Sequence, residues 1–218
     1  GGVDPDLADS ILEGLKGGWL AAAEALVTTQ YGLSANGEDL KIIIENNGAG
    51  GTAAYVQGLY GGDGKAIPGS LELHIDAADF APGYSVSNPS GGTSPFYADR
   101  IIAHEMVHAV MAVTTGNTNH PTWFLEGAAE YLHGAEERLW GSLGGDTSFA
   151  NAQSLISANA LASGWKGGSD SYSVAYVAAR YLDSIASNGL DGMLQRLENG
   201  TYASFDAAIA GETTHANA

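Results

Sequence analysis

The sequence predicts an α+β protein, with a small mixed sheet and helices in its N-terminal half and a helical C-terminal half. Three observations predict this class. Short runs of branched and aromatic residues, separated by glycine clusters, precede a long stretch of helical apolar spacing, and 44% hydrophobic content in 218 residues is enough for a sizeable core. We expect one domain over residues 1–218, with a sheet-containing subdomain at about 1–115 and a helical subdomain at about 116–218.

The elements are expected in the following order. A helix over 5–30 is predicted because leucine, isoleucine and tryptophan recur at spacings of three and four, and Gly32 with the turn at 34–37 ends it. Three runs are predicted as strands of one sheet: 41–45, 53–60 and 71–75. Residues 82–95 are rich in Gly, Ser, Asn and Pro, which indicates a surface loop. Helices are expected near 97–115, 121–138, 149–160, 171–187, 190–197 and 202–210.

The charge balance and the lack of cysteine narrow the chemistry and the partners. Lys and Arg number 8 against 25 Asp and Glu, and the formal charge of −17 repels both phosphate backbones and anionic lipids. Neither nucleic acid nor a membrane is therefore expected as a partner. Any metal site must use His, Asp or Glu. Abundant small polar residues with little Lys are typical of secreted or surface-assembled bacterial proteins, so we expect an extracellular protein, and its terminal segments look like the cut ends of a longer chain.

The segment His104-Glu105-Met106-Val107-His108 places two imidazoles and a carboxylate in an apolar helical run. Residues four apart on a helix differ by about 40° in azimuth, so both imidazoles project from one face and can chelate one ion. Glu105 lies about 100° further round, where its carboxylate can reach a water bound to that ion. The motif predicts a zinc site with a general base, although it also arises by chance in roughly one such chain in a hundred.

A third protein ligand must come from another segment, because two histidines leave zinc short of one. A metzincin would need Gly at position 111 and His at 114, where this chain has Met111 and Thr114. Glu126 follows His108 by 18 residues, after a turn that lets two antiparallel helices meet. Glu130 lies one turn further on the same face; it could compete as a ligand, but its offset better suits a hydrogen-bond acceptor for a ligating histidine.

On these motifs the sequence resembles the gluzincin metallopeptidases, in which the two histidines and a Glu on the following helix bind zinc. Trp-x-x-Glu-Gly-x-x-Glu at 123–130 is similar to bacterial collagenases, and 100–108 with 121–134 looks like flagellinolysin, the proteolytic domain of the variable region of some bacterial flagellins. The resemblance implies a thermolysin-like architecture with the cleft between the two halves. It makes His104, His108 and Glu126 the zinc ligands, and Glu105 the base that deprotonates the metal-bound water.

Peptide hydrolysis also needs a hydrogen-bond donor for the oxyanion. Three tyrosines within 171–181 are candidates: Tyr172, Tyr176 and Tyr181. Tyr172 resembles the collagenase tyrosine in its placement at the start of a helix, and it is the favoured candidate. All three are equally compatible with core rings whose hydroxyls reach water.

Other polar residues have weaker assignments. Substrate is expected along an exposed strand edge, for which the run at 53–60 is the candidate. Asp76 and Asp79 end the last strand and could join a calcium site of the kind that collagenases use, although acidic residues at strand ends are usually solvated. The remaining histidines within the fold are expected to be packed or surface residues rather than ligands: His74, His120 and His133.

Two functions fit the sequence. The first is a zinc-dependent endopeptidase that hydrolyses peptide bonds of extracellular proteins and is displayed on the bacterial flagellar filament, which it would join through flanking segments. The alternative is a non-enzymatic flagellin surface insert in which zinc is a structural ion. Glu105 favours the enzyme, because a structural site has no use for an acid that does not bind the metal. An aminopeptidase is less favoured, since residues 95–99 lack a Gly-x-x-x-Asn exopeptidase signature.

Overall fold

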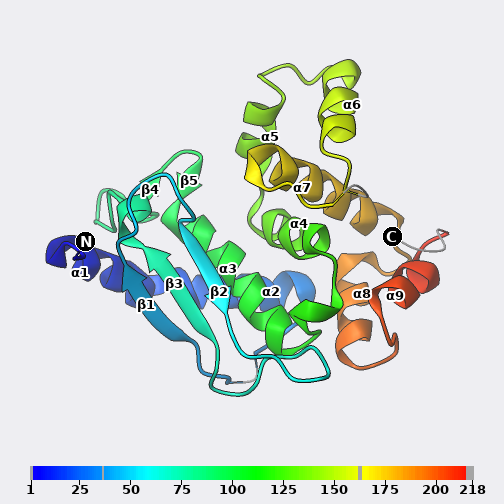
Figure 1. Ribbon diagram of the computed structural model, residues 1–218, viewed down its shortest axis with the longest axis horizontal. Helices are drawn as coiled ribbons and strands as arrows, with labels where there is room; N and C mark the ends of the chain where they lie inside the picture. The colour runs from blue at the N-terminus through cyan, green and yellow to red at the C-terminus, as the bar shows by residue number, and fades with distance from the viewer. Residues whose placement is uncertain (1, 36, 162–163, 215–218) are drawn as a thin grey trace. The chain divides into compact units, whose positions relative to one another are not determined.

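The computed structural model describes residues 2–35, 37–161 and 164–214, which form two compact units, Gly1–Thr118 and Asn119–Ala218. The first unit contains the strands with helices around them, and the second unit is helical in its described residues (Figure 1). The predicted combination of a small mixed sheet in the N-terminal half with a helical C-terminal half is therefore confirmed.

The main sheet of the first unit has the strand order β1-β3-β2. Its strands are β1 (Lys41–Glu45), β2 (Ala54–Gln57) and β3 (Glu72–Asp76). β3 pairs parallel with β1 and antiparallel with β2. Leu73 and Ile75 of β3 are buried, whereas His74 between them points to the opposite face, as the alternation of a strand requires. Because β3 lies between the other two strands, β2 lies at an edge of the sheet. β2 has four residues, whereas the predicted strand over 53–60 has eight.

The helices of the first unit are α1 (Pro5–Gly14), α2 (Leu20–Tyr31) and α3 (Ala98–Val113), with a π-helical turn at Leu15–Trp19 and 3₁₀ turns at Ala77–Phe80 and Asn117–Asn119. The predicted helix over 5–30 thus contains an irregular turn, in which Gly18 has a φ of 150°. The Trp19 indole donates from Nε1 to the Pro89 carbonyl oxygen at 2.8 Å, which ties this turn to a distant loop. α3 packs against α2 and against β2.

The end of the predicted loop over 82–95 is more ordered than the sequence indicates. β4 (Gly92–Thr93) and β5 (Phe96–Tyr97) form a short antiparallel hairpin directly before α3. Gly92 has a φ of 61°, and a Cβ atom there would lie 2.5 Å from the Phe96 carbonyl oxygen. Since this pairing depends on glycine rather than on alternating apolar residues, it leaves no strand pattern in the sequence.

The helices of the second unit are α4 (Thr122–His133), α5 (Glu136–Ser142), α6 (Phe149–Ala158), α7 (Gly168–Ile185), α8 (Gly189–Glu198) and α9 (Phe205–Glu212). α4 and α7 lie side by side and form the main packing contact (Figure 1). The prediction of one helix over 121–138 is wrong, because Gly134 adopts a φ of 74° and separates α4 from α5. Glycine adopts a positive φ without the steric cost that a side chain would bring, so the helix can end here.

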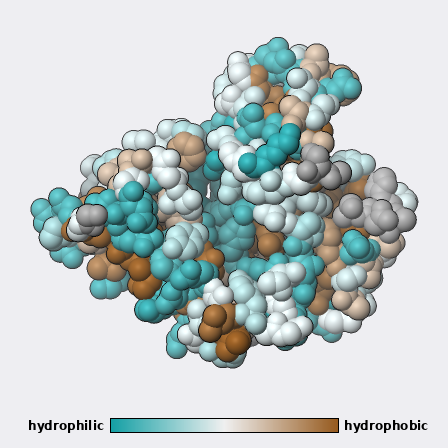
Figure 2. Space-filling view, viewed as in Figure 1, coloured by the Kyte–Doolittle hydropathy of each residue, from teal (hydrophilic) through white to brown (hydrophobic). Residues whose placement is uncertain are grey.

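The visible surface is mostly hydrophilic or intermediate in hydropathy, with apolar side chains in small separate patches (Figure 2). The most exposed large apolar side chains include those of Leu59, Val86 and Phe149. No helix in the described part of the chain is both long and apolar enough to cross a membrane.

Candidate metal centre

α3 brings two imidazole rings face to edge one turn apart. The Nε2 atoms of His104 and His108 are 3.1 Å apart, and the ring planes meet at 72°. Zinc–nitrogen bonds of about 2.0–2.1 Å at a tetrahedral angle separate two ligand nitrogens by about 3.3–3.4 Å. The nitrogen spacing on this helix therefore fits a single zinc ion.

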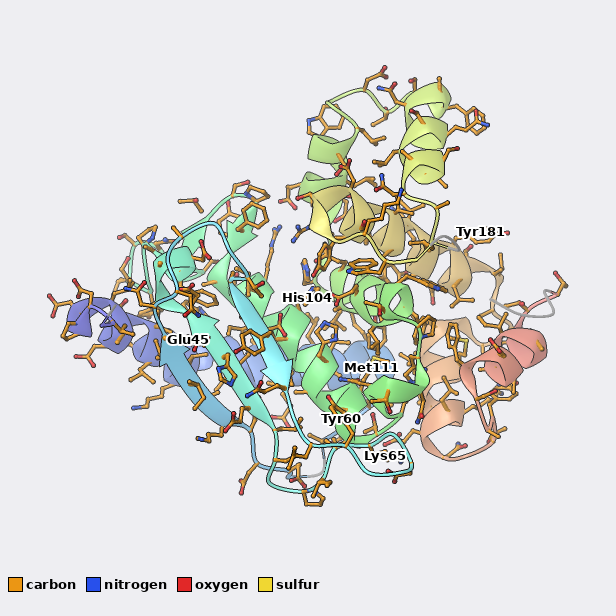
Figure 3. All side chains as sticks on the ribbon, in the orientation of Figure 1. Glu45, Tyr60, Lys65, His104, Met111 and Tyr181 are labelled. Carbon is orange, nitrogen blue, oxygen red and sulfur yellow. The ribbon has the colours of Figure 1, made fainter. Side chains whose placement is uncertain are left out.

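The helix that carries these histidines is held inside the first unit. His104 is 8% exposed and Glu105 is 7% exposed, and Met111, further along α3, is fully buried (Figure 3). At the end of α3 the Asn117 amide donates from Nδ2 to the His108 carbonyl oxygen at 3.0 Å. Burying a carboxylate such as that of Glu105 costs several kcal/mol before its partners compensate. A buried carboxylate at this position is therefore more consistent with a functional role than with packing alone.

α4 carries two carboxylates in different environments. Glu130 is fully buried, with Arg138 Nε at 2.9 Å from its Oε2 and His133 Nε2 at 3.4 Å from its Oε1. Glu126, one turn earlier, is only partly buried. Glu130 is thus engaged by basic side chains of its own unit, and Glu126 is the more accessible carboxylate.

Zinc needs a third protein ligand besides the two histidines, and Glu126 and Glu130 of α4 are the candidates for it. Coordination by Glu130 would compete with its ion pair to Arg138. Glu126 is therefore the better candidate for a third zinc ligand.

The three candidate tyrosines of α7 have different surroundings. Tyr176 is buried and donates from its hydroxyl to Glu136 Oε1 at 2.6 Å, and burial together with this hydrogen bond raises the pKa of Tyr176 to about 12. Tyr181 is 56% exposed. Tyr172, the fifth residue of α7, packs its ring against Trp165 and beneath the guanidinium of Arg138. Of the three, Tyr172 contacts Arg138, the side chain that forms an ion pair with Glu130.

Asp76 and Asp79 use their carboxylates to hold the loop after β1. Asp76 accepts hydrogen bonds from the backbone N–H groups of Asn47 and Ala78, at 3.1–3.3 Å. Asp79 Oδ1 accepts from the Gly50 N–H at 2.6 Å. Among the described residues neither aspartate belongs to a group with the ligand spacing of a metal site.

The other histidines pack against aromatic rings or carboxylates. His74 stacks on Tyr55 with ring centroids 4.6 Å apart, and its Nε2 lies 3.2 Å from Glu72 Oε2. His120 contacts Phe124 and Phe205, and burial lowers the pKa of His120 to about 4.

Sequence reasoning missed two residues next to the candidate site. His133 is placed near Glu130 by its spacing of three on α4, a signal that the sequence does contain. Arg138 reaches Glu130 only because the chain turns at Gly134, so helical spacing cannot reveal it.

No known protein family, no curated protein and no solved structure shows significant similarity to this chain. The assignment of the candidate site therefore rests on its residues and their geometry, together with the motif resemblance to gluzincins.

Proposed function

We propose that the chain is a zinc-dependent endopeptidase of the gluzincin type. The observation that carries the proposal is the pair of Nε2 atoms on α3, 3.1 Å apart, with the buried carboxylate of Glu105 next to His104 in the chain. Both imidazoles come from adjacent turns of one packed helix, so their spacing is maintained by the helix itself. His104, His108 and Glu126 would hold the ion.

Each remaining residue of the proposed site has a defined task. A bound zinc ion would polarise the scissile carbonyl and acidify an attacking water. Glu105 accepts a proton from that water and passes it to the leaving amine. Tyr172 donates a hydrogen bond to the carbonyl oxygen as it becomes negative. Glu130 is assigned a supporting role, because its carboxylate is already paired with Arg138.

The substrate is proposed to be an extended protein segment. β2 lies at an edge of the main sheet, where backbone groups without a neighbouring strand can pair with an added chain. Such pairing recognises the backbone, so it suits an endopeptidase that cuts within unfolded segments. A thermolysin-like arrangement of sheet, metal helix and following helices is part of this proposal.

The biological setting is proposed from composition and resemblance. A charge of −17 with little Lys suits an extracellular protein, and the two motifs resemble flagellinolysin. We therefore propose extracellular proteins as substrates and the bacterial flagellum as the location, with filament contacts made by flanking segments. A calcium ion near Asp76 and Asp79 stays a separate prediction.

The test is cleavage of an unfolded protein by the zinc-loaded chain, with and without a zinc chelator, and with cut sites mapped by mass spectrometry. Internal cuts that disappear on chelation support the proposal. Glu105→Gln should retain zinc and lower the cleavage rate by about 10²- to 10⁴-fold, because an amide cannot accept the proton. Glu24→Gln, on the exposed surface of α2, is the matched control and should cleave normally.

The same experiment separates the proposal from its alternative. A chain that binds one zinc tightly but makes no cuts would be a surface module with a structural ion. A Glu105→Gln variant that binds zinc and cleaves at the normal rate would contradict the role of Glu105.

A further inference from the structure

The Arg138 side chain contacts two residues that the proposed mechanism uses. Its Nε lies 2.9 Å from Glu130 Oε2, and its guanidinium carbon lies 5.1 Å from the ring centroid of Tyr172. These three residues come from α5, α4 and α7 of the second unit. We propose that Arg138 is a positioning residue. Its ion pair with Glu130 fixes the guanidinium, and the guanidinium holds the Tyr172 ring in place. This inference rests on the proposed function.

The burial of Glu130 explains why a strong cation is needed here. The side chain is 0% exposed, so its charge depends on partners inside the protein. Arg138 supplies a permanent positive charge, whereas His133 is charged only when it is protonated. Arg138 is thereby held in one orientation by the carboxylate, and a fixed guanidinium can in turn fix the ring that it covers.

Arginine suits this double contact better than lysine does. A guanidinium is planar and delocalised, so it can pair with a carboxylate through one edge while it also lies over an aromatic ring. An ammonium group is a compact, strongly hydrated charge, and it can keep the ion pair without covering the ring. Exchange of Arg138 for Lys therefore removes the contact with Tyr172 while it retains the charge beside Glu130.

The Tyr172 ring depends on side-chain contacts for its position. Tyr172 is the fifth residue of α7, and both Gly167 before the helix and Gly168 at its start have a φ of 73°. Trp165 meets the ring at 5.1 Å between centroids and at 82° between planes. Because glycine restricts the backbone less than other residues do, the start of the helix does not by itself fix the ring, and we assign the orientation of Tyr172 to Arg138 on one side and Trp165 on another.

The activity test compares Arg138→Lys, Tyr172→Phe and the double variant. Each single variant should lower kcat by about 10- to 100-fold with little change in KM and with zinc content unchanged, because the loss falls on the oxyanion donor. The double variant should be no slower than Tyr172→Phe, since both changes remove the same contribution. Arg180→Lys, on the exposed side of α7, is the matched control and should leave kcat unchanged.

A second readout does not depend on catalysis. In the zinc-free protein, Arg138→Lys should shift the fluorescence emission of Trp165, identified by its loss in Trp165→Phe, because Tyr172 packs against this indole. A shift supports the positioning role, and unchanged emission contradicts it.

The outcomes distinguish this inference from the proposed function. A normal kcat in Arg138→Lys, when Tyr172→Phe is impaired, would overturn the positioning role and leave the peptidase proposal intact. A double variant much slower than Tyr172→Phe would also overturn it, since Arg138 would then act through another group. If the wild-type chain cuts nothing, the proposed function fails and the catalytic purpose of Arg138 fails with it, whereas a shift of Trp165 emission would still show that Arg138 holds Tyr172.

Discussion

Gly127 lies where α4 packs tightly against α7, directly after the predicted zinc ligand Glu126. A Cβ atom built on Gly127 would overlap the carbonyl oxygen of Ala175, would lie 2.9 Å from its carbonyl carbon, and would lie 3.2 Å from the Ala179 Cβ. The obstacle is mainly backbone, which cannot turn away as a flexible side chain can. Gly127→Ala must therefore push the two helices apart.

The magnitude follows from two opposing effects. Overpacking of this kind costs about 1–3 kcal/mol, while replacing Gly by Ala inside a helix stabilises it by about 1 kcal/mol. Because the overlap is with backbone, we expect the upper part of that range, about 2–3 kcal/mol. The net loss in the free energy of unfolding is then about 1–2 kcal/mol, which for a chain of this size lowers the melting temperature by roughly 2–8 °C. Since Glu126 is the adjacent residue, the affinity for zinc should fall as well.

Thermal unfolding by circular dichroism and zinc competition with a chromogenic chelator measure the two effects. Gly141→Ala in α5 is the matched control, because nothing lies within 4 Å of its Cβ position, and this variant should be as stable as the wild type or slightly more so. A Gly127→Ala variant with wild-type melting temperature and zinc affinity would refute the close packing and its role in placing Glu126.

Three further predictions concern the helical unit. Glu126→Ala should abolish stoichiometric zinc binding in elemental analysis, whereas Glu130→Gln should keep the zinc but lose about 3–5 kcal/mol of stability, because it breaks a buried ion pair; the reverse pattern would exchange the two roles. Tyr176→Phe removes the hydroxyl that donates to Glu136, and it should cost about 1 kcal/mol in urea unfolding with kcat unchanged, so a large loss of kcat would make Tyr176 the oxyanion donor. Folding favours neutral His120, since burial lowers its pKa from 6.5 to about 4, so stability should fall by up to about 3 kcal/mol as pH drops from about 6.5 to about 4. His120→Phe should remove that part of the pH dependence, and an unchanged dependence would contradict the burial argument.

The parts of the fold that the sequence predicts depend on local patterns. The strand at Lys41–Glu45 agrees with its predicted bounds, because a short run of branched residues between turns is a local signal. The convergence of His104 and His108 is equally local, since helical geometry alone brings residues four apart to one face. The sequence does not predict the break at Gly134, because a glycine within a helical pattern is compatible with either a negative or a positive φ.

The sequence by itself determined the class of the fold, the helical histidine pair and the two carboxylates on the helix that follows. Only the tertiary structure decided how those carboxylates differ, because Arg138 engages Glu130 from across a helix break. It also decided which tyrosine is tied to the core, since Tyr176 bonds to a residue 40 positions away. The physical reason is that backbone periodicity acts over a few residues, whereas burial, ion pairing and ring packing depend on segments that meet only when the chain is folded.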